Sequence, residues 1–91
     1  MKVIIYSSDI CPDCVETKDR IAKANMDDLR CLFIDITENT GNLKRFLKLR
    51  DTLDLFDTVR RDHIIGIPLF QFEDGTYLLD KEEAFRKMGI I

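Results

Sequence analysis

Two short apolar runs, separated by a segment with helical spacing, constrain the fold of this chain more than any other feature. The runs are residues 3–6 and 31–36, and both are rich in the branched side chains that buried strands favour. The intervening segment places apolar residues at helical intervals, namely Cys14, Val15, Ile21, Ala22 and Met26. A strand, a helix and a strand of this size form a unit whose strands lie parallel. The pattern therefore predicts an α/β domain.

The second half of the chain predicts a helical stretch, a hairpin and a last helix. Residues 42–62 indicate one long helix or two, with a break near residues 51–52 where the apolar register drifts. Residues 69–72 and 76–79 read as strands around an Asp-Gly turn. Asp80 is a candidate N-cap for a helix over residues 81–88, which Gly89 ends. We expect the order β-α-β-α-β-β-α and a four-stranded mixed sheet flanked by helices.

Size and charge limit the classes of function. The 91 residues are expected to form a single domain over residues 1–91, and a hydrophobic content of 45% excludes a disordered chain. A net charge of −3 gives no clustered basic face for nucleic acid or an anionic membrane. No apolar run approaches the roughly 18 residues of a spanning helix, and the first residues are too polar for a signal-peptide core. We therefore expect a cytoplasmic protein with no nucleic-acid or membrane partner.

The pair Cys11 and Cys14, spaced C-x-x-C, is the strongest chemical signal. Three cysteines make a poor disulfide framework, and such a pair in a reducing compartment is more often redox-active or metal-binding. Cys11 is expected where the first strand ends and the first helix begins, with Pro12 in the first turn. The free N–H groups and dipole of a helix N-terminus favour a thiolate there. We therefore assign Cys11 as the catalytic nucleophile and Cys14 as the resolving thiol.

A zinc site is the main alternative for the same pair. A structural zinc ion needs four ligands, and the other candidates of that type are Cys31 and His63. Cys31 lies in an apolar strand and is expected to be a small core residue. His63 is expected at a helix C-terminus, where the dipole favours it. We therefore predict no metal ligand.

Residues 4–22, IIYSSDICPDCVETKDRIA, resemble the active-site segment of glutaredoxins. The match to the family pattern lies at Tyr6, Ser7, Cys11, Pro12, Cys14, Val15, Lys18, Asp19 and Ala22. The resemblance implies a thioredoxin-like fold in which a cis proline opens the third strand, and Pro68 is the match. It also implies that Ile67 offers its backbone groups to an extended substrate and that Asp80 faces the bound molecule. The candidate substrate-binding residues are Pro12, Ile67, Pro68 and Asp80.

The chain departs from the family pattern in four places, three of which concern glutathione or thiol ionisation. Ser8 stands where a lysine usually pairs with glutathione, and Leu78-Leu79 stands where a glycine pair lets it approach. Asp13 replaces a common tyrosine, and its charge opposes a neighbouring thiolate. The stretch over residues 43–63 is longer than in a minimal glutaredoxin and resembles a less studied branch of glutaredoxin-related proteins. Lys18 has two open interpretations, a residue that favours the thiolate or a surface lysine.

These observations predict an enzyme, a glutaredoxin-like thiol–disulfide oxidoreductase that acts as a small dithiol electron carrier. Its partners would be a protein disulfide or a small-molecule disulfide, with a reductase or glutathione as the electron source. No cofactor is expected to bind tightly, and glutathione would be a weak reductant or substrate. The alternatives are an iron–sulfur or metal-binding glutaredoxin-like protein and a non-enzymatic redox adaptor.

Overall fold

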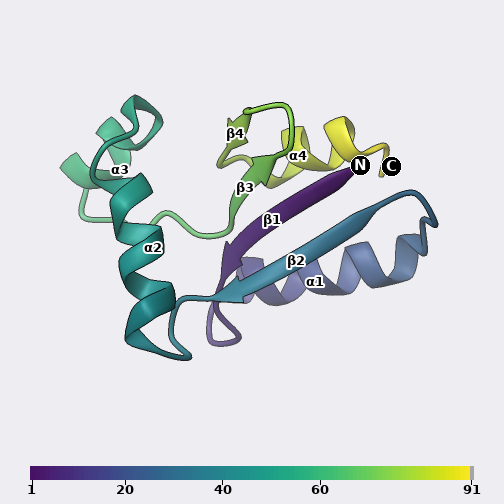
Figure 1. The fold of residues 1–91 in the computed structure, drawn as a ribbon, viewed down its shortest axis with the longest axis horizontal. Helices are drawn as coiled ribbons and strands as arrows, with labels where there is room; N and C mark the ends of the chain where they lie inside the picture. The colour runs from purple at the N-terminus through teal and green to yellow at the C-terminus, as the bar shows by residue number, and fades with distance from the viewer. Residues whose placement is uncertain (91) are drawn as a thin grey trace.

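Strand β1 (Lys2–Ser7) is the strand around which the sheet is built. In the computed structural model, which describes residues 1–90, β1 pairs in parallel with β2 (Arg30–Asp35) and antiparallel with β3 (Leu69–Phe72). Strand β4 (Tyr77–Leu78) pairs antiparallel with β3, so the spatial order is β2-β1-β3-β4 (Figure 1). The protein is thus a small α/β domain, and the predicted four-stranded mixed sheet is confirmed.

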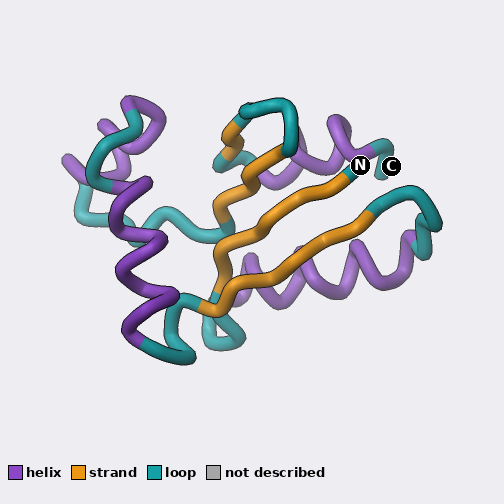
Figure 2. The backbone as a smooth tube through the Cα atoms, in the orientation of Figure 1, coloured by secondary structure: helices purple, strands orange, loops and turns teal. Residues whose placement is uncertain are grey.

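Helices cover both faces of this sheet. They are α1 (Pro12–Ala24), α2 (Thr40–Arg50), the 3₁₀ turn η1 (Asp54–Phe56), α3 (Asp57–Arg61) and α4 (Lys81–Met88). Helices α1 and α4 pack against one core cluster, whose buried members are Val3, Ile5, Phe70, Phe72, Ala84, Phe85, Met88 and Ile90. Helix α2 and η1 pack on the other face against a second cluster, formed by Tyr6, Ile34, Ile36, Phe46, Phe56 and Leu69. Figures 1 and 2 show α2 and α3 at the end of the sheet where β1 finishes.

Helix α1 begins directly after the first cysteine, as predicted. Cys11 is its N-cap, Pro12 occupies the first turn, and Asn25 ends it in the left-handed conformation. The buried face differs from the prediction, because Thr17 is fully buried whereas Val15 and Ala22 are exposed. The interior thus receives Cys14, Thr17, Ile21 and Ala24, which share one helical face.

The helical stretch after β2 is broken, as predicted, close to residues 51–52. Helix α2 ends at Arg50, and η1 and α3 follow a short turn. Arg60 donates to the carbonyl oxygens of Arg50 and Leu53, so its guanidinium satisfies backbone acceptors at the break. His63 follows the C-cap Asp62 of α3 with a φ of +58°, and its N–H donates to the carbonyl oxygen of Arg60 at 3.3 Å, so its predicted place at a helix C-terminus is confirmed. The chain reverses there and runs on to β3.

Two strands differ from their predicted form. Strand β2 was expected to be buried on both faces, but it lies at the sheet edge and Leu32 is exposed. Strand β4 covers residues 77–78 only, although the preceding turn has Gly75 at a φ of +90° as an Asp-Gly turn requires.

Asp80 caps α4 by accepting from Glu82 N at 2.9 Å, as predicted. None of the helices in residues 1–90 combines the length and apolar character that crossing a membrane requires.

Candidate dithiol site

The two thiols of the C-x-x-C segment lie together at the start of α1. The backbone N–H of Cys14 donates to Cys11 Sγ at 3.4 Å, so the sulfur of Cys11 is the side-chain acceptor of the helix N-cap. Cys11 is partly exposed, whereas Cys14 is 3% exposed. Both are free thiols, as is Cys31. The site therefore presents one accessible sulfur with a second sulfur buried one turn behind it.

The environment of Cys14 keeps that thiol protonated at neutral pH. Burial is the largest cause, the side-chain hydrogen bond with Cys11 is the next, and together they raise the pKa of Cys14 to about 12. The charge of Asp13 acts in the same direction with a smaller effect. The structure thus makes Cys11 the accessible thiol and keeps Cys14 buried and protonated, and their roles as nucleophile and resolving thiol stay predictions.

Lys81 is a residue of this site that we did not predict from the sequence. Its ammonium lies 2.9 Å from Asp13 Oδ1 and 2.7 Å from Glu16 Oε2, and these contacts raise the pKa of Lys81. The negative charge expected of Asp13 beside the thiols is therefore paired with a cation from α4. The sequence signal for Lys81 was the predicted N-cap Asp80. Because Asp80 caps α4, Lys81 is the first residue of that helix.

Lys18 makes its contacts away from the thiols. Its ammonium lies 3.4 Å from Asp9 Oδ1 and 5.2 Å from the centre of the Phe33 ring. The side chain is 52% exposed, which fits the surface interpretation of this residue. Its influence on Cys11 remains a prediction.

The segment before β3 meets the exposed thiol. The Ile67–Pro68 peptide bond is cis, as the resemblance implied, and the carbonyl oxygen of Ile67 lies 4.0 Å from Cys11 Sγ. Within residues 1–90, the N–H and C=O of Ile67 make no backbone hydrogen bond. Pro12 is exposed beside Cys11, and Pro68 is buried. Two of the candidate substrate residues, Pro12 and Ile67, therefore lie next to Cys11.

Ser8, Leu78 and Leu79, the residues expected to weaken a glutathione site, have different surroundings in the structure. Ser8 is buried, its hydroxyl lies 2.9 Å from Thr37 Oγ1, and it accepts from Ile10 N at 3.3 Å. It therefore offers no charge to an anion. Leu78 and Leu79 are half-buried and pack against the two core clusters, one each. Neither leucine lines the groove that contains Cys11.

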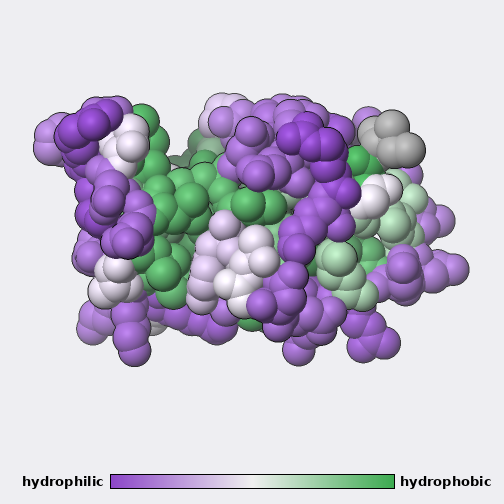
Figure 3. Space-filling model, turned by 90° about the horizontal axis from the view of Figure 1, so that it is seen from above, coloured by the Kyte–Doolittle hydropathy of each residue, from purple (hydrophilic) through white to green (hydrophobic). Residues whose placement is uncertain are grey.

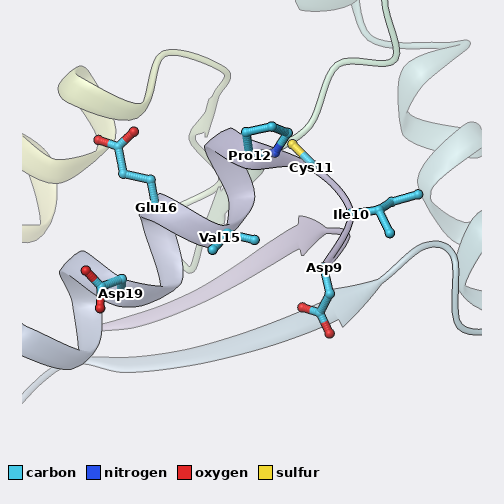
Figure 4. Close-up of a pocket in the computed structure, with 7 residues that line it drawn as sticks. All are labelled: Asp9, Ile10, Cys11, Pro12, Val15, Glu16 and Asp19. Atoms are coloured by element: carbon cyan, nitrogen blue, oxygen red, sulfur yellow. The ribbon is translucent and has the colours of Figure 1, made fainter.

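That groove is the main feature that sequence reasoning missed. It has a volume of about 360 Å³, and we call it the apolar groove. Its lining residues are Ser8, Ile10, Cys11, Pro12, Ile36, Thr37, Ile64, Ile65, Gly66 and Ile67. On its other side, Cys11 borders a second hollow lined by Asp9, Ile10, Pro12, Val15, Glu16 and Asp19 (Figure 4). The adjacent isoleucines Ile64 and Ile65 after α3 were the available signal, because an apolar pair that belongs to neither a helix nor a strand has no regular element to bury it.

The remaining candidates lie apart from the thiol pair. Cys31 is half-buried and packs against the α1–α4 cluster, and burial raises its pKa. This agrees with the predicted core role. His63 is exposed. In residues 1–90 there is no group of three or more His, Cys, Asp or Glu side chains arranged to hold a metal ion.

The geometry defines a small α/β domain with a paired-thiol site at a strand–helix junction. An uncharacterized protein of Haemophilus influenzae is 28% identical to this chain over 79 residues, which is 87% of this chain and 88% of that protein. No family model matches the chain, and no solved structure matches it.

Proposed function

We propose that this protein is a thiol–disulfide oxidoreductase of the glutaredoxin type, with a thioredoxin-like fold. The observation that carries the proposal is the asymmetry of its two thiols. Cys11 is an accessible helix N-cap whose sulfur accepts a backbone N–H, and Cys14 is buried one turn behind it with its pKa raised to about 12. A dithiol carrier needs this division between an attacking and a resolving sulfur.

The reaction proceeds in two exchanges. Cys11 attacks as a thiolate, because the thiolate is the reactive form. It bonds to one sulfur of the substrate disulfide, and the other sulfur leaves as a thiolate. Cys14 then gives up its proton and attacks Cys11 Sγ, which closes the Cys11–Cys14 disulfide and releases the second substrate thiol. The substrate disulfide gains the two electrons that the protein dithiol loses.

The free backbone groups of Ile67 beside Cys11 support the proposal that the substrate binds as an extended segment. Ile67 has backbone N–H and C=O groups free of backbone partners within the described chain, and its oxygen is 4.0 Å from Cys11 Sγ. An extended segment that pairs with these groups would hold its disulfide next to the thiol. Pro12 is exposed beside Cys11 in the first turn of α1, and Asp80 serves as the cap of α4. In this proposal glutathione is a weak reductant or substrate, since Ser8 supplies no positive charge.

The proposal is tested by following disulfide reduction with each thiol removed in turn. All proteins carry Cys31→Ser, so that only the pair can react. We expect Cys11→Ser to abolish exchange with an insulin disulfide. Cys14→Ser should accumulate a mixed disulfide on Cys11, visible by intact mass. Equal activity of Cys11→Ser and the parent would refute the assignment of the nucleophile, and absence of exchange in the parent would refute the proposed function.

The source of electrons is tested with the oxidised parent protein. Glutathione with glutathione reductase, and a flavin-dependent thioredoxin-type reductase, are supplied in separate assays and NADPH consumption is followed. We expect slow recycling by glutathione. Rapid recycling at a physiological glutathione concentration would contradict the weakened glutathione site.

A further inference from the structure

The apolar groove exposes large hydrophobic side chains directly beside the nucleophile. Ile10 is 83% exposed, Ile65 is 60% exposed and Ile64 is 54% exposed, and all three line the groove that contains Cys11. Figure 3 shows hydrophobic surface gathered in the hollow between the α2–α3 end and the rest of the molecule. Exposed apolar side chains that converge on one groove mark a binding surface more often than scattered ones do.

The wall formed by Ile64 and Ile65 is held in place by the helix it faces. Arg50 on α2 donates from Nη2 to the carbonyl oxygen of Ile64 at 2.6 Å and from Nε to that of Ile65 at 2.9 Å. The next residue, Gly66, is buried at a φ of +94° against the Phe56 ring. With their carbonyl groups bonded to Arg50, the two isoleucines belong to a preformed wall. A preformed groove binds a ligand without the cost of ordering a loop.

The side-chain hydroxyls of the groove are already engaged in hydrogen bonds. The hydroxyls of Ser8 and Thr37 lie 2.9 Å from each other, and Thr37 Oγ1 also donates to Asp35 Oδ1 at 2.6 Å. No lysine or arginine of the described chain lines the apolar groove or the adjacent hollow. That hollow instead has Asp9, Glu16 and Asp19 in its lining, with the Glu16 carboxylate directed toward α4 and Ile10 directed to the opposite side (Figure 4).

These features discriminate between two kinds of disulfide. Glutathione carries a net negative charge from its carboxylates, and neither cavity at Cys11 has a lining cation to pair with it. A polypeptide with an apolar residue beside its half-cystine would instead remove exposed isoleucine surface from water. The Ile67 backbone lies in the same groove and is free to pair with such a segment.

We propose that the apolar groove selects protein disulfides that present a large apolar side chain next to the half-cystine, in preference to glutathione disulfides. This inference rests on the proposed function and names its substrate class. The apolar side chain packs against Ile10, Ile64 and Ile65 while Cys11 attacks the neighbouring sulfur.

The test uses mixed disulfides of thionitrobenzoate with three thiols. The thiols are the capped peptides Ala-Cys-Leu-Ala and Ala-Cys-Asn-Ala, in which leucine and asparagine have similar shapes, and glutathione. Excess reduced protein carrying Cys31→Ser reacts in a single turnover. Cys11 bonds to the thiol's sulfur, thionitrobenzoate leaves as a coloured thiolate, and Cys14 then closes the protein disulfide and frees the thiol. The colour gives the rate of attack.

We expect the leucine peptide to react about tenfold faster than the asparagine peptide and than glutathione, a ratio equivalent to about 1.4 kcal/mol. Ile65→Ser should move the leucine-to-asparagine ratio toward one. The matched control is Leu55→Ser, which removes an exposed apolar side chain of η1 outside the groove and should leave the ratio unchanged.

Several results would overturn the inference. They are equal rates for both peptides in the parent protein, a ratio that Ile65→Ser does not change, or fastest reaction with glutathione. A parent dimer that Ile65→Ser dissociates in sedimentation velocity would show that the groove seats a second copy instead. Failure of the proposed function gives a different result, because intact mass would then show no Cys11–Cys14 disulfide after reaction with any of the three probes.

Discussion

Removing Cys11 should leave a second thiol that is almost inert at neutral pH. The perturbation is Cys11→Ser in a Cys31→Ser background, which makes Cys14 the sole thiol. In the parent protein the pKa of Cys14 is raised from 9.0 to about 12, which lowers its thiolate fraction at neutral pH about a thousandfold; the variant loses the part of this shift that Cys11 causes. Alkylation requires the thiolate, and the side chain is only 3% exposed. Burial is the largest cause of the raised pKa and persists in the variant.

The assay is the rate of carbamidomethylation by iodoacetamide, followed by intact mass from neutral pH to about pH 11. We expect Cys14 to react at least about a hundredfold more slowly than a cysteine in an unstructured peptide at neutral pH, with a rate that still rises at the upper end of the range. The companion variant, Cys14→Ser in the same background, leaves Cys11 alone and should react much faster than Cys14. A Cys14 rate close to that of the peptide would refute the reasoning, provided that circular dichroism shows a folded variant.

Because the pKa of Cys14 is raised, the free energy of unfolding should depend on pH in the alkaline range. The unfolded state loses the Cys14 proton at its ordinary pKa of 9.0, whereas the folded state keeps it until about 12. The contribution of this thiol to stability is therefore fully present below pH 9 and is lost progressively between pH 9 and 12. From about pH 9 to pH 10 the loss is about 1 kcal/mol. Urea unfolding of the reduced protein should show this slope, and Cys14→Ala should lack it; parallel curves would contradict the linkage.

Two further predictions concern the wall of the apolar groove and the charges beside the thiols. Gly66→Ala places a Cβ 2.7 Å from the Phe56 ring at a φ of +94° and should destabilise the fold by about 2–3 kcal/mol in urea unfolding. Gly75→Ala has a similar φ but no atom within 4 Å, so it should cost about 1 kcal/mol, and equal losses would refute the packing argument. Lys81→Met leaves the α1 carboxylates unpaired and should slow the attack of Cys11 on an anionic disulfide at low salt, with a difference that closes as salt screens it. A salt-independent difference would point to lost packing instead.

The parts of the fold that were predictable are those with a local cause. The parallel pairing of β1 with β2 follows from a strand–helix–strand unit, and the sequence around Pro12 and Gly89 marks where helices begin and end. The break after Arg50 was predictable from a drift in apolar register. Each of these features depends on residues within one or two turns of one another. Their physical causes, backbone geometry and capping, are visible in the sequence letters themselves.

The errors arose where distant elements decide burial. Val15 follows helical spacing as well as Thr17 does, yet Thr17 is buried and Val15 is exposed. Thr17 tolerates burial because its hydroxyl donates to Asp13 O at 2.7 Å, a bond within its own helix. Leu32 has the apolar character of a buried strand, but it is exposed on the edge strand β2. Hydrophobic periodicity identifies the apolar face of a helix or strand. It does not indicate how much of that face the neighbouring elements cover.

In the candidate site, too, the features with a local cause were predictable and those formed by distant elements were not. Cys11 and Cys14 were found from their spacing, because one helical turn is a local distance. The groove beside them was not, since it requires that Arg50 on α2 bind the carbonyls of Ile64 and Ile65. An apolar pair is normally driven inward, but here the backbone of the pair is tied to a helix and the side chains are left exposed beside a thiol. Exposed apolar surface lowers the stability of an isolated chain, and burial against a partner recovers that free energy. The placement of that surface at Cys11 is the physical reason for our proposal that a partner meets the thiol and the isoleucines together.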